Sequence, residues 1–187
     1  FNVCPGRNNP VIARIDGRVS SARMRWGLVP NWSKEPRTDA SSINARSETM
    51  AEKPFFRDSF RNRRCLAPAD GWYEWKTEGK RKTPYFIHLP GEESFAFAGL
   101  WDKWEGTGVD PFASYAVITK EAHESVSVIH HRMPVILPER HWGTWLDASA
   151  SLETVSSILE DALGGFESRT VSDLVNDVKN EGSELTN

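Results

Sequence analysis

The sequence predicts a single α+β domain, with a twisted or barrel-like, mostly antiparallel β-sheet core and peripheral helices. Its 187 residues are enough for one domain with a full core. Its apolar content of 39% and charged content of 26% are those of an ordinary globular protein. Short apolar segments bounded by Gly, Pro, Asn and Asp outnumber helical patterns. We therefore expect residues 1–187 to form one unit.

The strand pattern recurs along most of the chain. Eight strands are expected, at residues 11–15, 23–29, 65–67, 72–75, 84–89, 95–101, 115–119 and 133–137. Residues 86–89 and 95–98 flank a Pro90-Gly91 turn, which predicts a β-hairpin. Three helices are expected, at residues 47–61 with a break at Pro54, at 138–146, and at 152–163 before Gly164-Gly165.

Charge is unevenly distributed along the chain. The net charge is −3, yet residues 1–90 carry a balance of +8 and residues 91–187 a balance of −11. This asymmetry permits a basic groove for a polyanion in the first half. From charge alone, two solvated charge sets that neutralise each other on folding are the more common explanation.

Cysteine and histidine spacing gives no sign of a disulfide framework or a metal site. The two cysteines, Cys4 and Cys65, lack metal-ligand spacing, and the five histidines lack the spaced partners of a zinc site. No apolar run approaches the ~20 residues that cross a bilayer. We expect no metal, no cofactor and no membrane contact. An intracellular protein is expected.

Glu74 lies in an aromatic segment, Gly-Trp-Tyr-Glu-Trp at residues 71–75. A carboxylate among aromatic side chains is costly to ionise, so its pKa tends to rise and it becomes a candidate general acid. A salt bridge to Lys76 or Lys82 at a sheet edge is the alternative.

Asn44 and Arg46 would share one face if their segment is extended. The amide suits an oxyanion or a nucleophile, and the guanidinium suits a phosphate. Asn44 is otherwise an ordinary turn residue.

His130 and His131 precede Arg132 and Pro134, where a helix or turn leads into a strand. A histidine there can exchange protons near neutral pH, or it can simply bond a backbone carbonyl. Trp32 follows Pro30-Asn31 and is expected to be exposed and able to stack on a base. Cys65 is expected to be buried, and Cys4 to lie in a turn.

Several motifs taken together resemble the SOS-response-associated peptidase (SRAP) family. They occur in family order over nearly the whole chain, at residues 1–6, 25–30, 44–49, 64–75, 129–134 and 176–182. Members of this family bind single-stranded DNA and covalently trap abasic sites. The resemblance implies an SRAP-like fold and an abasic-site crosslinking enzyme that also processes its own N-terminus.

The resemblance also implies a mechanism. The α-amine of an N-terminal cysteine, with a pKa near ~8, condenses with the sugar aldehyde to an imine, and the thiol then closes a thiazolidine. Asn44, Glu74 and His130 would be catalytic. DNA contacts would come from Arg46, Arg132, Trp32, Pro5 and Asn2. The expected partner is single-stranded DNA carrying abasic sites, bound by a monomer. The resemblance implies a DNA-associated protein of the cytoplasm, or of the nucleus in a eukaryote.

The chain departs from the family pattern at its start. It begins at Phe1, in a segment that the family places after its N-terminal cysteine, and Cys4 does not match that cysteine. We expect residues 1–187 to lack an N-terminal segment that carries the nucleophile. Two alternatives stay open: a thiol-type peptidase acting on proteins, and a module that binds single-stranded DNA without bonding to it covalently.

Overall fold

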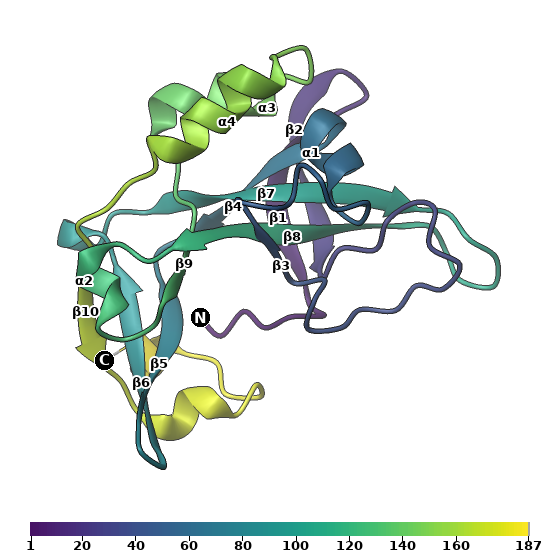
Figure 1. The fold of residues 1–187 in the computed structure, drawn as a ribbon. Helices are drawn as coiled ribbons and strands as arrows, with labels where there is room; N and C mark the ends of the chain where they lie inside the picture. Colours follow the sequence, from purple (N-terminus) through teal and green to yellow (C-terminus); the bar gives the residue numbers. More distant parts are fainter. Residues whose placement is uncertain (187) are drawn as a thin grey trace.

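The computed structural model describes residues 1–186 and consists of two sheets with short helices at their edges (Figure 1). The larger sheet has seven strands: β1 (Asn8–Ile15), β2 (Arg18–Trp26), β3 (Asn44–Arg46), β4 (Arg64–Ala69), β7 (Phe95–Trp104), β8 (Phe112–Glu121) and β9 (Arg132–Pro134). The smaller sheet contains β5 (Trp72–Glu78), β6 (Arg81–His88) and β10 (Glu167–Thr170).

The larger sheet closes on itself. Its strands run in the order β2-β1-β4-β7-β8-β3, and β2 also pairs with β8 through Arg25↔Ser114 and Trp26↔Tyr115. The β2–β8 and β3–β8 pairs are parallel, whereas the other pairs are antiparallel. The predicted α+β class with a barrel-like, mostly antiparallel sheet is therefore confirmed.

The helices are short and peripheral. They are α1 (Arg57–Asn62), α2 (Glu124–Ser127), α3 (Trp142–Leu146) and α4 (Leu152–Glu160), with 3-10 turns η1 (Pro90–Glu92), η2 (Glu139–His141), η3 (Asp173–Asn176) and η4 (Ser183–Thr186). Figure 1 shows α3 and α4 together above β7 and β8 in this view. Within residues 1–186, no helix combines the length and apolar character needed to cross a bilayer.

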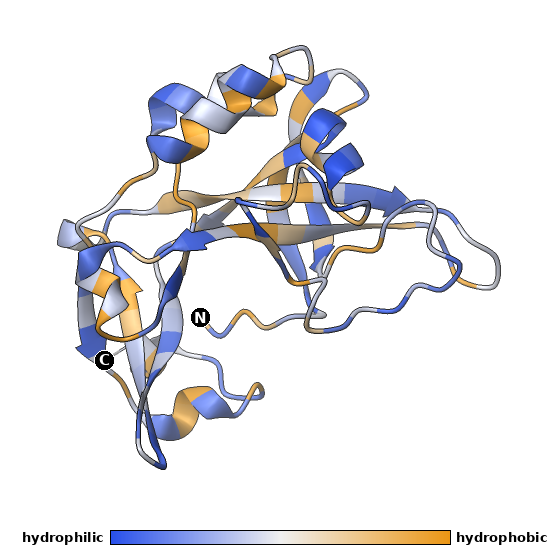
Figure 2. Cartoon of the chain, in the orientation of Figure 1, coloured by the Kyte–Doolittle hydropathy of each residue, from blue (hydrophilic) through white to orange (hydrophobic). Residues whose placement is uncertain are grey.

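Three apolar clusters hold these layers together. One fills the barrel, with Val11, Met24 and Tyr115 among its members. Another joins the barrel to the helices, with Leu100 and Trp145 among its members. Figure 2 shows the corresponding apolar stretches along β7 and β8, with polar residues towards the strand ends.

The third cluster positions the functional residues. It joins Trp72 of β5 and Ile87 of β6 to Ile129 and Met133, which lie on either side of His130 in the sequence. Because burial of such side chains stabilises the fold by about 1.5–3 kcal/mol each, the small sheet is held firmly against this segment. Glu74 and His130 are thereby brought close to each other.

The predicted hairpin across Pro90-Gly91 is wrong. β6 pairs with β5 and β10, whereas β7 pairs with β4 and β8, so the two segments belong to different sheets. The turn η1 between them carries the chain from one sheet to the other. Local pattern identifies two neighbouring strands but does not determine which sheet each joins.

Other predicted elements differ mainly in extent. Of the expected helix at residues 47–61, only α1 at its end forms, and the stretch before it consists of turns. The expected strand at 133–137 is shortened to β9. Strands β3 and β10 were not predicted, because runs of three and four residues carry little periodic signal.

Candidate active site

A cavity of about 560 Å³ opens beside the small sheet. Its lining comes from three separate regions of the chain: Glu74, Trp75 and Thr77 of β5, Lys82 of β6, His130, and Asn176 of η3. This volume lies within the range of small-molecule sites.

Glu74 is the acid of this cavity. Its Oε2 lies 3.8 Å from Nδ1 of His130, and its side chain is 23% exposed. Burial raises the pKa of the Glu74 carboxyl, while the nearby His130 partly lowers it again. Glu74 therefore keeps its proton to higher pH than an ordinary glutamic acid, which suits a proton donor.

His130 is held in place whether or not its Nδ1 carries a proton. Nδ1 lies 3.0 Å from the carbonyl oxygen of Arg132 and 3.2 Å from its backbone nitrogen. A protonated Nδ1 donates to this carbonyl, and an unprotonated Nδ1 accepts from the N–H. The ring thus keeps a hydrogen-bond partner in either state, as a group that transfers protons requires.

The alternative, a salt bridge from Glu74 to Lys76 or Lys82, is not found among the described residues. Lys76 pairs with Glu78 at 3.0 Å, and the ionic partner found for Glu74 is His130. Lys82 lines the cavity at its exposed edge, on the strand next to β5. Within residues 1–186, no lysine or arginine is paired with the carboxyl of Glu74 to hold it ionised.

Arg46 and Arg132 lie around one carboxylate, that of Glu48. The Arg132 guanidinium binds Glu48 at 2.7 and 2.9 Å and donates to the Thr119 carbonyl at 2.7 Å. The pKa of Glu48 is lowered mainly by this hydrogen bond, with a smaller contribution from the charge of Arg46. Arg46 is exposed and free to meet a phosphate, whereas at Arg132 a phosphate competes with Glu48.

Asn44 and Arg46 share the exposed face of β3, as expected, and Ala45 between them is buried. β3 lies against β8 in the barrel, with Asn44 opposite Val117. Asn44 is not among the residues that line the cavity in the described part of the chain. The structure thus brings Glu74 and His130 together and places Asn44 on the neighbouring sheet.

The three remaining predicted DNA contacts differ in exposure. Trp32 is 57% exposed and meets Phe55 edge-on, at a centroid distance of 6.3 Å. Pro5 is exposed. Asn2, in contrast, is buried, and its Nδ2 donates to the carbonyls of Val175 and Asp177. Because both of these hydrogen bonds are internal to the protein, the side-chain nitrogen of Asn2 is not available to DNA, and Asn2 is not part of the candidate DNA interface.

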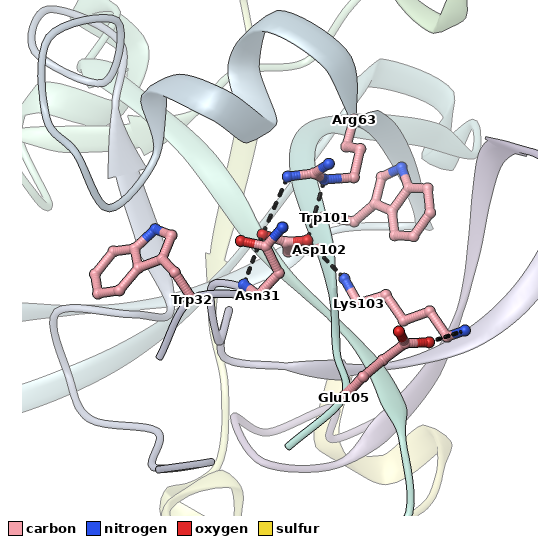
Figure 3. A pocket seen from close by; sticks show the side chains of 7 residues that line it. All are labelled: Asn31, Trp32, Arg63, Trp101, Asp102, Lys103 and Glu105. Atoms are coloured by element: carbon pink, nitrogen blue, oxygen red, sulfur yellow. Dashed lines mark hydrogen bonds and ion pairs between the residues drawn. The ribbon is translucent and has the colours of Figure 1, made fainter. Parts of the chain in front are cut away.

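Trp32 lines a second cavity, of about 500 Å³, together with Asn31, Arg63, Trp101, Asp102, Lys103 and Glu105 (Figure 3). Asp102 is only 3% exposed and is surrounded by donors. Its oxygens lie 3.1 and 3.2 Å from the guanidinium of Arg63 and accept from the backbone N–H groups of Asn31 and Lys103. These bonds fasten the loop after β2 to β7.

Neither cysteine in the described residues is activated as a nucleophile. Cys65 is fully buried in the barrel, as expected, and burial raises the pKa of its thiol. Cys4 is half-buried, which also raises its thiol pKa, and its Sγ lies 3.5 Å from the Asn2 carbonyl oxygen. Both thiols stay protonated at neutral pH.

Trp75, Thr77 and Asn176 were not singled out as site residues from the sequence. Asn176 begins one of the motifs at residues 176–182, so a signal was present, although nothing local connected it to Glu74. Trp75 Nε1 donates to Asn176 Oδ1 at 2.8 Å, across 101 positions in the sequence. Only the folded chain reveals this contact.

The fold and the site together define a class: an α+β protein with an acid–base pair in an open cavity and exposed cationic residues on the adjoining sheet. A family model described as "SOS response associated peptidase (SRAP)" matches residues 1–178. The chain belongs to the SRAP family.

Relatives from bacteria and animals carry names that refer to DNA lesions. The chain is 40% identical over 189 residues to abasic site processing protein YoaM of Bacillus subtilis, covering 99% of this chain and 83% of the relative. It is 36% identical over 186 residues to abasic site processing protein HMCES of Gallus gallus, covering 86% and 55% of the two chains.

A solved structure has the same fold. The crystal structure of a Bacteroides thetaiotaomicron protein superposes with a TM-score of 0.82 at 28% identity, covering 97% of this chain and 81% of that one.

Proposed function

We propose that this protein binds single-stranded DNA and processes abasic sites by trapping them covalently through an N-terminal cysteine. The observation that carries the proposal is the Glu74–His130 pair, 3.8 Å apart in an open cavity. The names of the two relatives described above, both abasic site processing proteins, agree with this substrate.

The proposed chemistry needs an amine, a thiol and two proton transfers. The amine nitrogen attacks the aldehyde carbon of the ring-opened sugar, a C=N bond forms, and the carbonyl oxygen leaves as water. The thiol sulfur then adds to the imine carbon, and its proton passes to the nitrogen. Protonated Glu74 assists sugar ring opening and loss of water, and His130 accepts and returns protons in imine formation and reversal.

The DNA is proposed to pass over the exposed face of β3 and the rim of the cavity. Arg46 holds a phosphate there, and Trp32 and Pro5 contact the strand. Arg132 joins this interface if a phosphate displaces Glu48 from its guanidinium. Asn44 orients the reacting amine from β3. Removal of the protein's own N-terminal residue is part of the same proposal.

The proposal is tested by incubating the full-length protein with single-stranded DNA that carries one abasic site, followed by a denaturing gel. We expect a heat-stable band of reduced mobility, absent with undamaged DNA. Chemical blocking of the N-terminal amine should abolish this band.

Each other outcome rejects part of the proposal. Binding without a covalent band favours a non-covalent DNA-binding module. A band that survives blocking of the amine excludes the N-terminal imine route. Cleavage of an added protein substrate without a DNA adduct favours the thiol-type peptidase.

A further inference from the structure

Asn176 contributes an amide to the same cavity as Glu74 and His130. It ends η3, is exposed, and is bonded through its Oδ1 to Nε1 of Trp75 at 2.8 Å. The proposed chemistry has so far assigned this residue no role.

The contact with Trp75 fixes which way the amide points. An indole N–H can only donate, so the oxygen of Asn176 must face it, and the NH₂ group must point elsewhere. Across residues 1–186, no hydrogen bond is found for Asn176 Nδ2. Two N–H donors are therefore available beside Glu74 and His130.

The turn that carries Asn176 is braced from two sides. Asn2 donates to the carbonyls of Val175 and Asp177, the residues before and after it. Asn180 donates to the carbonyl of Leu174 at 2.8 Å. Donors held on such a braced turn lose little freedom when a ligand binds, which makes their hydrogen bonds effective.

We propose that Asn176 is a substrate-binding residue that donates a hydrogen bond to the C1′ oxygen of the abasic deoxyribose. The inference rests on the proposed function and deepens it. A neutral amide donor suits a hydroxyl or carbonyl oxygen, whereas the phosphates are left to the arginines. A site built to bond this oxygen also disfavours a sugar that lacks it, because its donors then stay unpaired.

The test compares two unreactive lesions in the same single-stranded DNA. One is a borohydride-reduced abasic site, which keeps an oxygen on C1′, and the other is a tetrahydrofuran analogue, which lacks it. We expect the full-length protein to bind the reduced site about three- to tenfold more tightly, as one hydrogen bond would provide. Asn176→Asp and Asn176→Ala should abolish this preference.

The two variants separate the donors from other effects. Asn176→Asp keeps an oxygen that accepts from Trp75 but loses the two N–H donors. Its added negative charge weakens the binding of both DNAs equally, so it cancels in the ratio of the two affinities. Asn176→Ala adds no charge. Lys179→Gln, an exposed position in the same segment, changes the net charge by the same amount as Asn176→Asp and should leave the ratio unchanged.

Failure of this inference is distinguishable from failure of the proposed function. If the wild type shows no preference, or the Asn176 variants keep it, Asn176 does not bind the C1′ oxygen. The covalent band with an unreduced abasic site is scored separately on the wild type, and its absence rejects the proposed function alone.

Discussion

Two carboxylates in cavities of similar size show how differently the same chemical group can be used. Asp102 is 3% exposed and lies among Arg63 and two backbone N–H groups, which together satisfy both of its oxygens (Figure 3). Glu74 is 23% exposed, and its ionic partner is an imidazole 3.8 Å away.

The difference lies in how many donors the carboxylate receives. A buried carboxylate that receives several donors is held in place by them and acts as a structural anchor. A carboxyl that is desolvated without such donors has a raised pKa and can give up and regain a proton. We infer that Asp102 serves folding and that Glu74 serves chemistry.

The largest expected effect is on activity at Glu74. Glu74→Gln keeps the shape and removes the transferable proton, so we expect the rate of covalent adduct formation to fall by about 100-fold. The rate is measured from time courses on denaturing gels. Glu78→Gln, on the same strand but exposed and paired with Lys76, is the matched control and should react normally. An unchanged rate for Glu74→Gln would show that this carboxyl is not the acid.

A smaller effect is expected on stability at Asp102. Asp102→Asn leaves the partly buried Arg63 guanidinium without its counter-ion and should lower the free energy of unfolding by about 2 kcal/mol. Urea denaturation measures this loss. Adduct formation per folded molecule should stay close to that of the wild type. A variant that folds normally and fails to react would reverse the roles assigned to the two carboxylates.

The smallest effect is the pH dependence of stability. Because the folded protein raises the pKa of Glu74, it binds this proton more tightly than the unfolded chain does. The associated stability is complete below the ordinary glutamate value of ~4.3 and is lost as pH rises through the folded-state pKa. Glu74→Gln lacks this loss, so its stability relative to the wild type should increase between pH 4 and pH 8. Urea denaturation midpoints across this range measure the trend. If the wild type instead becomes more stable relative to the variant towards pH 8, the pKa of Glu74 is not raised in the folded protein.

Prediction from the sequence succeeded where the signal was local. The apolar runs that became β1, β4, β7 and β8 are bounded by turn residues, and their alternation reflects burial on one face. Glu74 was singled out because aromatic residues surround it in the sequence, and the structure gives it the raised pKa that this implied.

Prediction failed where the outcome depended on distant partners. The hairpin expected at Pro90-Gly91 does not form, because β6 and β7 each find better partners in separate sheets. No local pattern indicated that Arg132 is bound to Glu48, 84 positions away. Nor did one indicate that Asn2 is buried against residues 175 and 177.

The sequence by itself determined the fold class and most strands, and it singled out Glu74 and His130 as the candidate acid and base, because composition, alternation and neighbouring side chains are local properties. Only the tertiary structure decided that Glu74 lies 3.8 Å from His130 and shares a cavity with Asn176, and that Asp102 is bonded to Arg63 and two backbone N–H groups. These outcomes depend on groups from distant parts of the chain that desolvate a carboxylate or donate to it. At Glu74 and His130, the two segments are held together by the cluster that contains Trp72 and Ile129.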